Sequence, residues 1–190
     1  WVEGRHQLED FSRQAKIPSA DHSASPYNVF HAPTPDQMLR VAVGLGLKRG
    51  VLQNAYQVLR GRDPVEKKVK DELRDARFAE LQDAQAKVLN LTDWHEYNTC
   101  IKSAGFRSKS MLTSENNFLY GYLIYLIGKH EFSVERRTLR NVMSRWFFMS
   151  AITGRYTGSP ETVLEADLRR FQQVEQTPES FVQLLDTVIS

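Results

Sequence analysis

Apolar residues recur along most of the chain at the three- and four-residue spacing of an amphipathic helix, and the alternation typical of a strand is almost absent. In the segment 134–153, apolar residues stand at i, i+3, i+4, i+7 and i+8, namely Leu139, Val142, Met143, Trp146 and Phe147. Further helices are predicted at 3–16, 35–45, 50–60, 64–90, 93–104 and 115–128, and two more after residues 159 and 177. The sequence therefore predicts an all-α protein, a compact multi-helix bundle of about eight helices.

Residues that favour helix starts precede several of these segments. Asp63 with Pro64, the pair Thr92-Asp93, Ser114 and Ser133 are expected to begin four helices. The last two helices are predicted to open with a cap followed by proline, at Ser159-Pro160-Glu161 and Thr177-Pro178-Glu179. Segment 115–128 is apolar on nearly all sides and is expected to be central and buried, whereas the charged segment 64–90 is expected to pack through one face.

A loop separates the beginning of the chain from the main helical region. Residues 18–35 hold four prolines among small polar residues, which predicts an extended segment. We therefore divide the chain into an N-terminal helix fragment with an extended loop, 1–35, and a helical domain, 36–190. The chain begins at Trp1 without the pattern of a signal peptide, and we expect it to be a fragment of a longer protein.

Composition narrows the class of protein. A hydrophobic content of 41% and a charged content of 25% are ordinary for a globular domain, and a net charge of +2 does not by itself indicate nucleic-acid binding. The single cysteine, Cys100, excludes an internal disulfide and fits a reducing, cytoplasmic compartment. The longest apolar run, 118–128, is shorter than the roughly 20 residues that cross a bilayer. We expect no membrane association.

Two local patterns contain residue types used in catalysis or nucleotide binding. Asp21, His22, Asn28 and His31 are the residue types of a ββα-metal nuclease, but their spacing is compressed and no strands flank them, which favours a polar surface loop. The glycine-rich segment 44–50 follows a helix instead of joining a strand to a helix. A left-handed helix end explains one of its glycines better than a phosphate loop does.

The remaining candidates for chemistry are isolated residues. Cys100 shares a helix face with apolar residues, which favours a buried thiol over a nucleophile. His95 and His130 each stand alone in the sequence. We therefore predict no catalytic residue, no metal site and no cofactor within this chain.

Positive charge gathers between residues 129 and 145. The segment contains five basic residues and two acidic ones, and three of the basic residues, Arg136, Arg137 and Arg140, share one polar face of the predicted helix. These three are the candidate nucleic-acid-binding residues, because arginines on one stripe can meet successive phosphates. A solvated face, or pairing with the acidic helix 64–90, explains the same pattern.

The segment 154–161 joins two predicted helices through a polar corner. Arg155 and Tyr156 lie between Gly154, which ends one helix, and the start of the next, so neither is needed for helix formation. Arg155 could pair with Glu161 or Asp167 and so fix the corner between the two helices. The alternative is an arginine that faces a ligand.

Four segments together resemble one bacterial family. They are VLQNAYQVLRGRDP (51–64), VLNLTDWHEYNTCIKSAGFRSKSML (88–112), NNFLYGYLIYLIGK (116–129) and RWFFMSAITGRYTGSPETVLEADL (145–168). They resemble the helical half of the domain-of-unknown-function family that includes GmrSD-type, modification-dependent restriction enzymes. The resemblance covers about residues 36–170. Its most specific elements are Arg-Trp-Phe-Phe (145–148) and Gly-Arg-Tyr-Thr-Gly-Ser (154–159). The resemblance marks a family corner without an assigned catalytic role, at Arg145, Trp146, Arg155, Tyr156, Ser159 and Glu161.

The resemblance implies a role in phage defence or DNA-modification sensing. In that family a ParB-like N-terminal domain with an Asp-Gly-Gln-Gln-Arg type motif is associated with nucleotide binding and hydrolysis, and many members add a C-terminal HNH nuclease domain. Neither motif is in this sequence, so neither activity transfers to its residues. The implied partners are an upstream ParB-like domain of the same chain, DNA, and a second copy through self-association, and the full-length parent would be an NTP-dependent endonuclease. The alternative is a protein-interaction scaffold with no nucleic-acid role.

Overall fold

The computed structural model describes residues 2–16, 28–61 and 71–189, and in these ranges the protein is all-α, as predicted. The described residues form nine α-helices and one short 3-10 helix, and they contain no strand. The helices are α1 (Val2–Gln14), α2 (Pro35–Leu47), α3 (Leu52–Leu59), α4 (Asp71–Val88), α5 (Leu91–Ser103), α6 (Glu115–His130), α7 (Arg136–Ile152), α8 (Pro160–Gln173) and α9 (Pro178–Ile189). The 3-10 helix η1 (Lys109–Met111) precedes α6.

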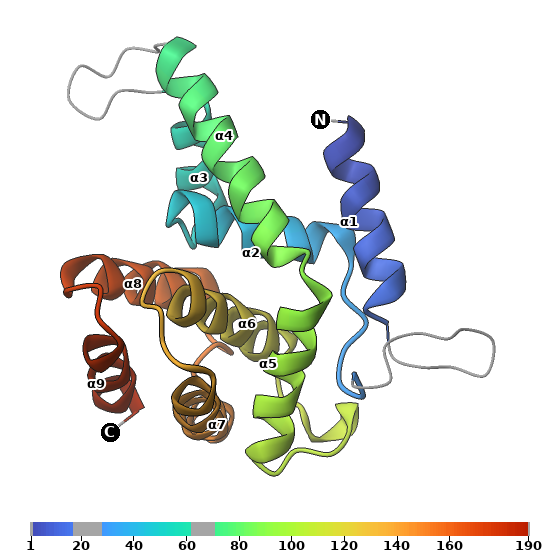
Figure 1. Ribbon diagram of the computed structural model, residues 1–190, viewed down its shortest axis with the longest axis vertical. Coiled ribbons are helices and arrows are strands. Elements are labelled where there is room, and N and C mark those ends of the chain that lie inside the picture. The colour runs from blue at the N-terminus through green and yellow to red at the C-terminus, as the bar shows by residue number, and fades with distance from the viewer. Residues whose placement is uncertain (1, 17–27, 62–70, 190) are drawn as a thin grey trace.

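Helix α6 is the centre of the bundle, as its apolar sequence predicts. Every residue from 117 to 128 is buried, and α6 packs against α2, α5 and α7 (Figure 1). Aromatic rings from α5 and α6 meet edge to face, with ring centroids 5.0 Å apart for Trp94 and Tyr122 and 5.2 Å apart for Tyr97 and Phe118. Such pairs add to the free energy of burial, since the ring edges and faces carry opposite partial charges.

The buried tyrosines of this centre retain hydrogen-bond partners. The Tyr97 hydroxyl donates to the carbonyl of Phe118 at 2.7 Å, and the Tyr122 hydroxyl donates to the carbonyl of Val88 at 2.8 Å. Burial without a partner would cost each hydroxyl about 1–3 kcal/mol. These bonds tie α5 and the end of α4 to the central helix.

Helix α1 belongs to the same apolar core as the later helices. Leu8, Phe11 and Ala15 are buried, and Phe11 packs edge to face on Trp94 with ring centroids 5.9 Å apart. Part of the predicted loop, 28–34, is described and is not helical, whereas residues 17–27 lie outside the described ranges. Asn28 joins the end of α1 to this loop by donating to the carbonyls of Ala15 and His31, both at 2.5 Å.

Several helix starts follow the predicted chemistry, and two are corrected. The Ser114 side chain accepts from the amide of Asn117, as expected of a cap. Helix α5, however, begins after Asn90, whose side chain accepts from the amides of Thr92 and Asp93, so the predicted Thr92-Asp93 cap is wrong. Asn90 and Thr92 are both good caps in sequence, and in the structure Asp93 pairs with Lys129 of α6.

Helix α7 also begins later than predicted. Its cap is Glu135, which accepts from the amides of Arg137 and Thr138, and not Ser133, which adopts a left-handed conformation with φ of 51°. At the last two helices the predicted starts hold, because Pro160 and Pro178 are the first residues of α8 and α9. The Ser159 side chain makes no capping bond.

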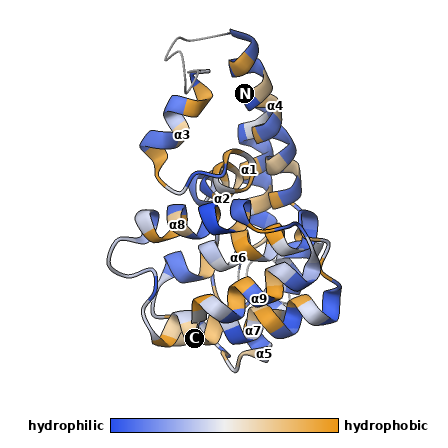
Figure 2. Cartoon of the chain, turned by 90° about the vertical axis from the view of Figure 1, so that its left-hand side faces the viewer, coloured by the Kyte–Doolittle hydropathy of each residue, from blue (hydrophilic) through white to orange (hydrophobic). Residues whose placement is uncertain are grey.

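Helices α3 and α4 extend from the rest of the bundle at one end, opposite α7 and α9 (Figures 1 and 2). Of the apolar residues expected in the predicted helix 50–60, only Ala55 is buried, and Tyr56 is 58% exposed. In α4 the buried side chains are confined to its second half, from Leu81 to Val88. The predicted start at Asp63 lies outside the described residues. Among the helices described, none is both long and apolar enough to cross a membrane.

Candidate functional site

The three arginines predicted to meet DNA occupy the first turns of α7 but do not share one environment. Arg136 donates through Nε to Glu96 of α5 at 3.0 Å, while its side chain remains 67% exposed. Arg137 is exposed and Arg140 is half-buried, and within the described ranges neither makes an ion pair. The carboxylate that pairs with one of these arginines is therefore Glu96 of α5, and not a residue of the charged helix α4.

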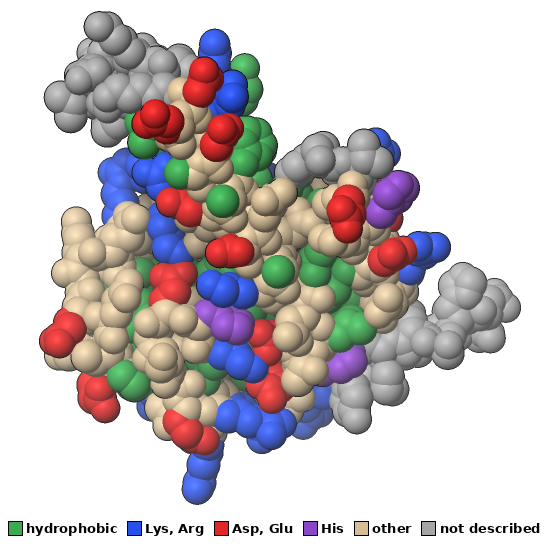
Figure 3. Space-filling model, turned by 45° about the horizontal axis from the view of Figure 1, so that its top comes forward, with side chains coloured by type: hydrophobic (Ala, Val, Ile, Leu, Met, Phe, Trp, Pro, Cys, Tyr) green, Lys and Arg blue, Asp and Glu red, His purple; other side chains and the backbone are tan. Residues whose placement is uncertain are grey.

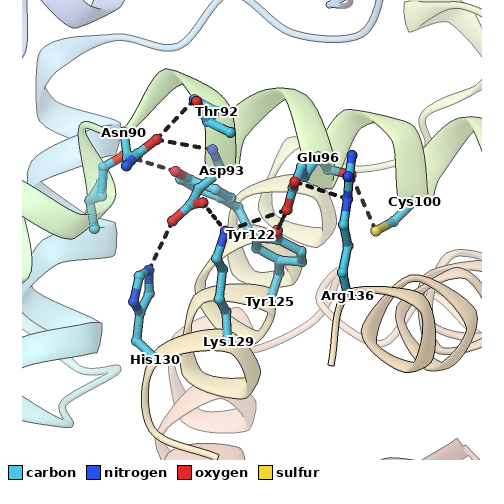
Figure 4. Close-up of polar contacts among 11 residues, drawn as sticks. Asn90, Thr92, Asp93, Glu96, Cys100, Tyr122, Tyr125, Lys129, His130 and Arg136 are labelled. Carbon is cyan, nitrogen blue, oxygen red and sulfur yellow. Dashed lines mark hydrogen bonds and ion pairs between the residues drawn. The ribbon is translucent and has the colours of Figure 1, made fainter. Parts of the chain in front are cut away.

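Glu96 is one member of a larger charged network between α5 and the end of α6 (Figure 4). Asp93, whose side chain is 2% exposed, bonds Lys129 through one oxygen and His130 Nε2 through the other, the latter at 2.8 Å. Lys129 also lies 3.4 Å from Glu96, which accepts from the Tyr125 hydroxyl at 2.8 Å. Figure 3 shows acidic, basic and histidine side chains side by side near the middle of one face.

The network holds Asp93 and Lys129 in their charged forms. Burial raises the pKa of Asp93, but hydrogen bonds from His130 and Lys129 outweigh it and leave this pKa below its ordinary value. Burial lowers the pKa of Lys129, but the hydrogen bonds and negative charges of Asp93 and Glu96 together outweigh it, and the net shift is upward. His130 stands alone in the sequence, so nothing there indicated that Asp93 would be its partner. Asp93 was predicted only as a cap.

The polar corner is formed by Arg155, Tyr156 and Asp167. The Arg155 guanidinium donates to both Asp167 oxygens, at 2.5 and 3.3 Å, and the Tyr156 hydroxyl donates to Asp167 at 2.7 Å. Arg170 donates to the same carboxylate at 2.9 Å. Burial raises the pKa of Tyr156 far above its usual value, so the hydroxyl stays protonated as a donor. Of the two partners left open for Arg155, the structure selects Asp167.

The other residues of the family corner lie in separate contacts. Glu161 pairs with Arg40 of α2, and Arg145 pairs with Asp186 of α9 at 2.8 and 3.1 Å. Trp146 is fully buried and packs beside Tyr156 with ring centroids 6.1 Å apart. Ser159 is exposed. The six residues are therefore spread over contacts of α8 with α2, of α7 with α9, and of the corner itself.

A carboxylate that sequence analysis missed, Glu165, joins α8 to the turn before α3. It accepts from the amides of Gly50 and Val51 at 2.6 and 3.1 Å. A Cβ at Gly50 would lie 2.5 Å from the amide nitrogen of Glu165, so only glycine permits this approach. In the sequence, the only sign of this contact was Gly50, a glycine that no helix end requires. The left-handed residue after α2 is in fact Lys48, with φ of 53°, and not one of the glycines.

The remaining sequence candidates have structural partners or fall outside the described residues. Asp21 and His22 are outside them. His31 is buried and its Nε2 lies 2.8 Å from Gln37 Oε1. Burial raises the pKa of the Cys100 thiol to about 12, which leaves it a poor nucleophile. In the part of the chain that the structure describes, no group of three or more His, Cys, Asp or Glu side chains could hold a metal ion.

No protein-family model, no curated protein and no solved structure matches this chain. The account of the site therefore rests on the geometry of its residues. The corner and the α5–α6 network are charge clusters that join helices through buried carboxylates, and the first turns of α7 present arginines to solvent. These arrangements can stabilise a helical body and attract phosphate groups.

Proposed function

We propose that this chain is a non-catalytic helical domain of a bacterial restriction-type or phage-defence protein. It would couple an upstream nucleotide-binding, ParB-like domain of the same polypeptide to a nuclease or another partner. The proposal rests on the bonds that the buried carboxylates make. Asp93, Glu165 and Asp167 each bind groups on another helix or turn, so they hold the helices in place.

The arginines of α7 provide the proposed contact with DNA. Arg137 and Arg140 have no ion-pair partner among the described residues, and Arg136 keeps most of its side chain in solvent. Arginines one helical turn apart, such as Arg136 and Arg140, can reach phosphates along one strand of a duplex. Through these phosphate contacts the domain would sense DNA without contacting the bases.

The direct test compares this chain with the full-length parent in nucleotide-hydrolysis and DNA-cleavage assays. We expect the parent to be active and the isolated chain to be inert, because the chemistry is assigned to the other domains. Hydrolysis or cleavage by the isolated chain would contradict the proposal. So would a parent reading frame that lacks a glutamine-arginine motif upstream of Trp1.

The DNA contact has a separate test in the double variant Arg137→Gln/Arg140→Gln. Loss of two phosphate contacts should lower the slope of log K against log salt by about 2, measured by fluorescence anisotropy with a duplex. The matched control is Arg74→Gln/Arg77→Gln on α4, which removes one exposed and one half-buried arginine at the other end of the bundle. Equal losses in the two variants, or no DNA binding by the parent chain, would contradict the contact.

A second candidate function is a protein-interaction scaffold. Large apolar side chains are exposed in pairs one turn apart, Leu52 with Tyr56 on α3 and Phe148 with Ile152 on α7. Exposed apolar pairs of this kind suit association with another protein. Light scattering separates the two functions, since a chain that stays monomeric with and without the upstream domain would count against the scaffold.

A further inference from the structure

A groove runs along α9 beside the start of α7. Its volume is about 760 Å³, within the range of about 300–1,000 Å³ common for ligand sites. On the α7 side it is lined by Ser133, Glu135 and Thr138, and on the α9 side by a face that extends from Pro178 to Thr187. At 1.5 Å per helical residue this face is about 14 Å long. The groove is therefore long enough to hold several side chains of an extended or helical segment.

All the charged residues that line the groove are acidic. Glu135, Glu179 and Asp186 line it, and none of its lining residues is basic. Asp186 is paired with Arg145, which joins α7 to α9 next to the groove. Glu135 and Glu179 make no ion pair with any residue in the described ranges. Glu135 at the start of α7 and Glu179 at the start of α9 thus carry negative charge that no ion pair within the described ranges neutralises.

Glu135 remains charged in this position. Its Oε2 accepts from the amides of Arg137 and Thr138 at 2.9 and 3.1 Å, and these bonds hold its pKa below the ordinary value. Both amide bonds use Oε2, which leaves Oε1 free of backbone bonds and able to accept from a ligand. The groove surface also includes the side chains of Pro178 and Val182.

We propose that the α7–α9 groove binds a cationic, amphipathic segment of a partner protein. Apolar side chains of the segment would lie on Pro178 and Val182, and its lysines or arginines would pair with Glu135 and Glu179. Charge complementarity selects this occupant, because the same carboxylates repel phosphate groups and acidic peptides. The inference does not depend on the proposed role in DNA defence, since it concerns a protein ligand and a different surface from the arginines of α7.

The test uses a labelled helical peptide of about 14 residues with leucines on one face and lysines elsewhere, and a second peptide in which glutamate replaces every lysine. Binding to the full chain is followed by fluorescence anisotropy. We expect saturable binding of the basic peptide, and affinity for the acidic peptide lower by about tenfold or more. The variant Glu135→Gln/Glu179→Gln should weaken binding of the basic peptide by about tenfold.

The control for general charge effects is Glu72→Gln/Asp83→Asn, which removes two exposed acids of α4 and should leave the affinity unchanged. Because Glu135 also caps α7, circular dichroism melts check that the variant folds, and Glu179→Gln alone provides a variant with no capping role. Absence of saturable binding, equal binding of the two peptides, or an equal loss in the α4 control would overturn the proposal. Self-association of the chain that excludes the basic peptide would overturn it as well, because the occupant would be a second copy.

Discussion

Three buried carboxylates join separate segments of this bundle. Asp93, Glu165 and Asp167 are exposed by 5% or less, which is costly for a charged group unless other groups replace its hydration. Each has at least two donors within hydrogen-bond distance. The donors to Asp93 and Glu165 belong to distant parts of the chain, and those to Asp167 include two residues of the preceding corner, so each carboxylate joins its helix to another segment.

The lowered pKa of Asp93 predicts a pH dependence of stability. Its carboxyl binds a proton less readily in the folded than in the unfolded state, so its stabilisation is present above the ordinary pKa of about 3.9 and is lost as pH falls through the folded value. Asp93→Asn should therefore lower the free energy of unfolding by about 1–3 kcal/mol at neutral pH, and by much less in strong acid. Urea denaturation across this range measures the difference.

The matched control for that experiment is Asp83→Asn, which neutralises an exposed carboxylate of α4. It should change the free energy of unfolding by less than about 0.5 kcal/mol at every pH. If the loss caused by Asp93→Asn were the same in strong acid as at neutral pH, the charge of Asp93 would not be its source.

Pairs of helices meet through close backbone contacts as well as through charge. The turn after α2 lies against α8, where an added Cβ at Gly50 would come 2.8 Å from the carbonyl oxygen of Glu161. Gly128 of α6 is similarly close to the Phe181 ring of α9. Glycine at these positions thus reflects the distance between two helices and not the conformation of a turn.

The variant Gly50→Ala tests this explanation at the level of the helix pair. The methyl group must push the turn away from α8 and weaken the bonds to Glu165, which should lower the free energy of unfolding by about 1–3 kcal/mol. Gly158→Ala is the matched control, because its Cβ would meet nothing within 4 Å. Equal stability of the two variants in urea denaturation would show that the contact at Gly50 is unimportant.

Stability is unevenly distributed over the whole molecule. The central helix α6 is buried on all sides from residue 117 to 128, whereas no residue of α4 from 71 to 80 is buried. Backbone amides exchange with solvent through local opening where few apolar contacts must be broken, and through global unfolding in the core. The bundle therefore has a stable centre and a projecting end formed by α3 and α4 (Figure 2).

Hydrogen exchange should reproduce this distribution. We expect amides of α6 between residues 118 and 127 to exchange more slowly than those of α4 between 74 and 80 by about three orders of magnitude or more. Measurement by NMR or mass spectrometry at one pH gives both rates in the same sample. Similar protection in the two segments would contradict a projecting, weakly packed α4.

The helices and the central position of α6 were predictable from the sequence, because apolar spacing, proline and caps such as Ser114 act within a few residues. Borderline starts were not, since Thr92 is also a good cap beside Asn90, and Ser133 is by preference a better cap than Glu135. The partners of the charged residues were decided by tertiary structure alone. Arg155 had two carboxylates within reach along the chain, and Glu165 meets Gly50 across more than a hundred residues. Local patterns determine helices, whereas contacts between remote segments depend on how those helices pack in space.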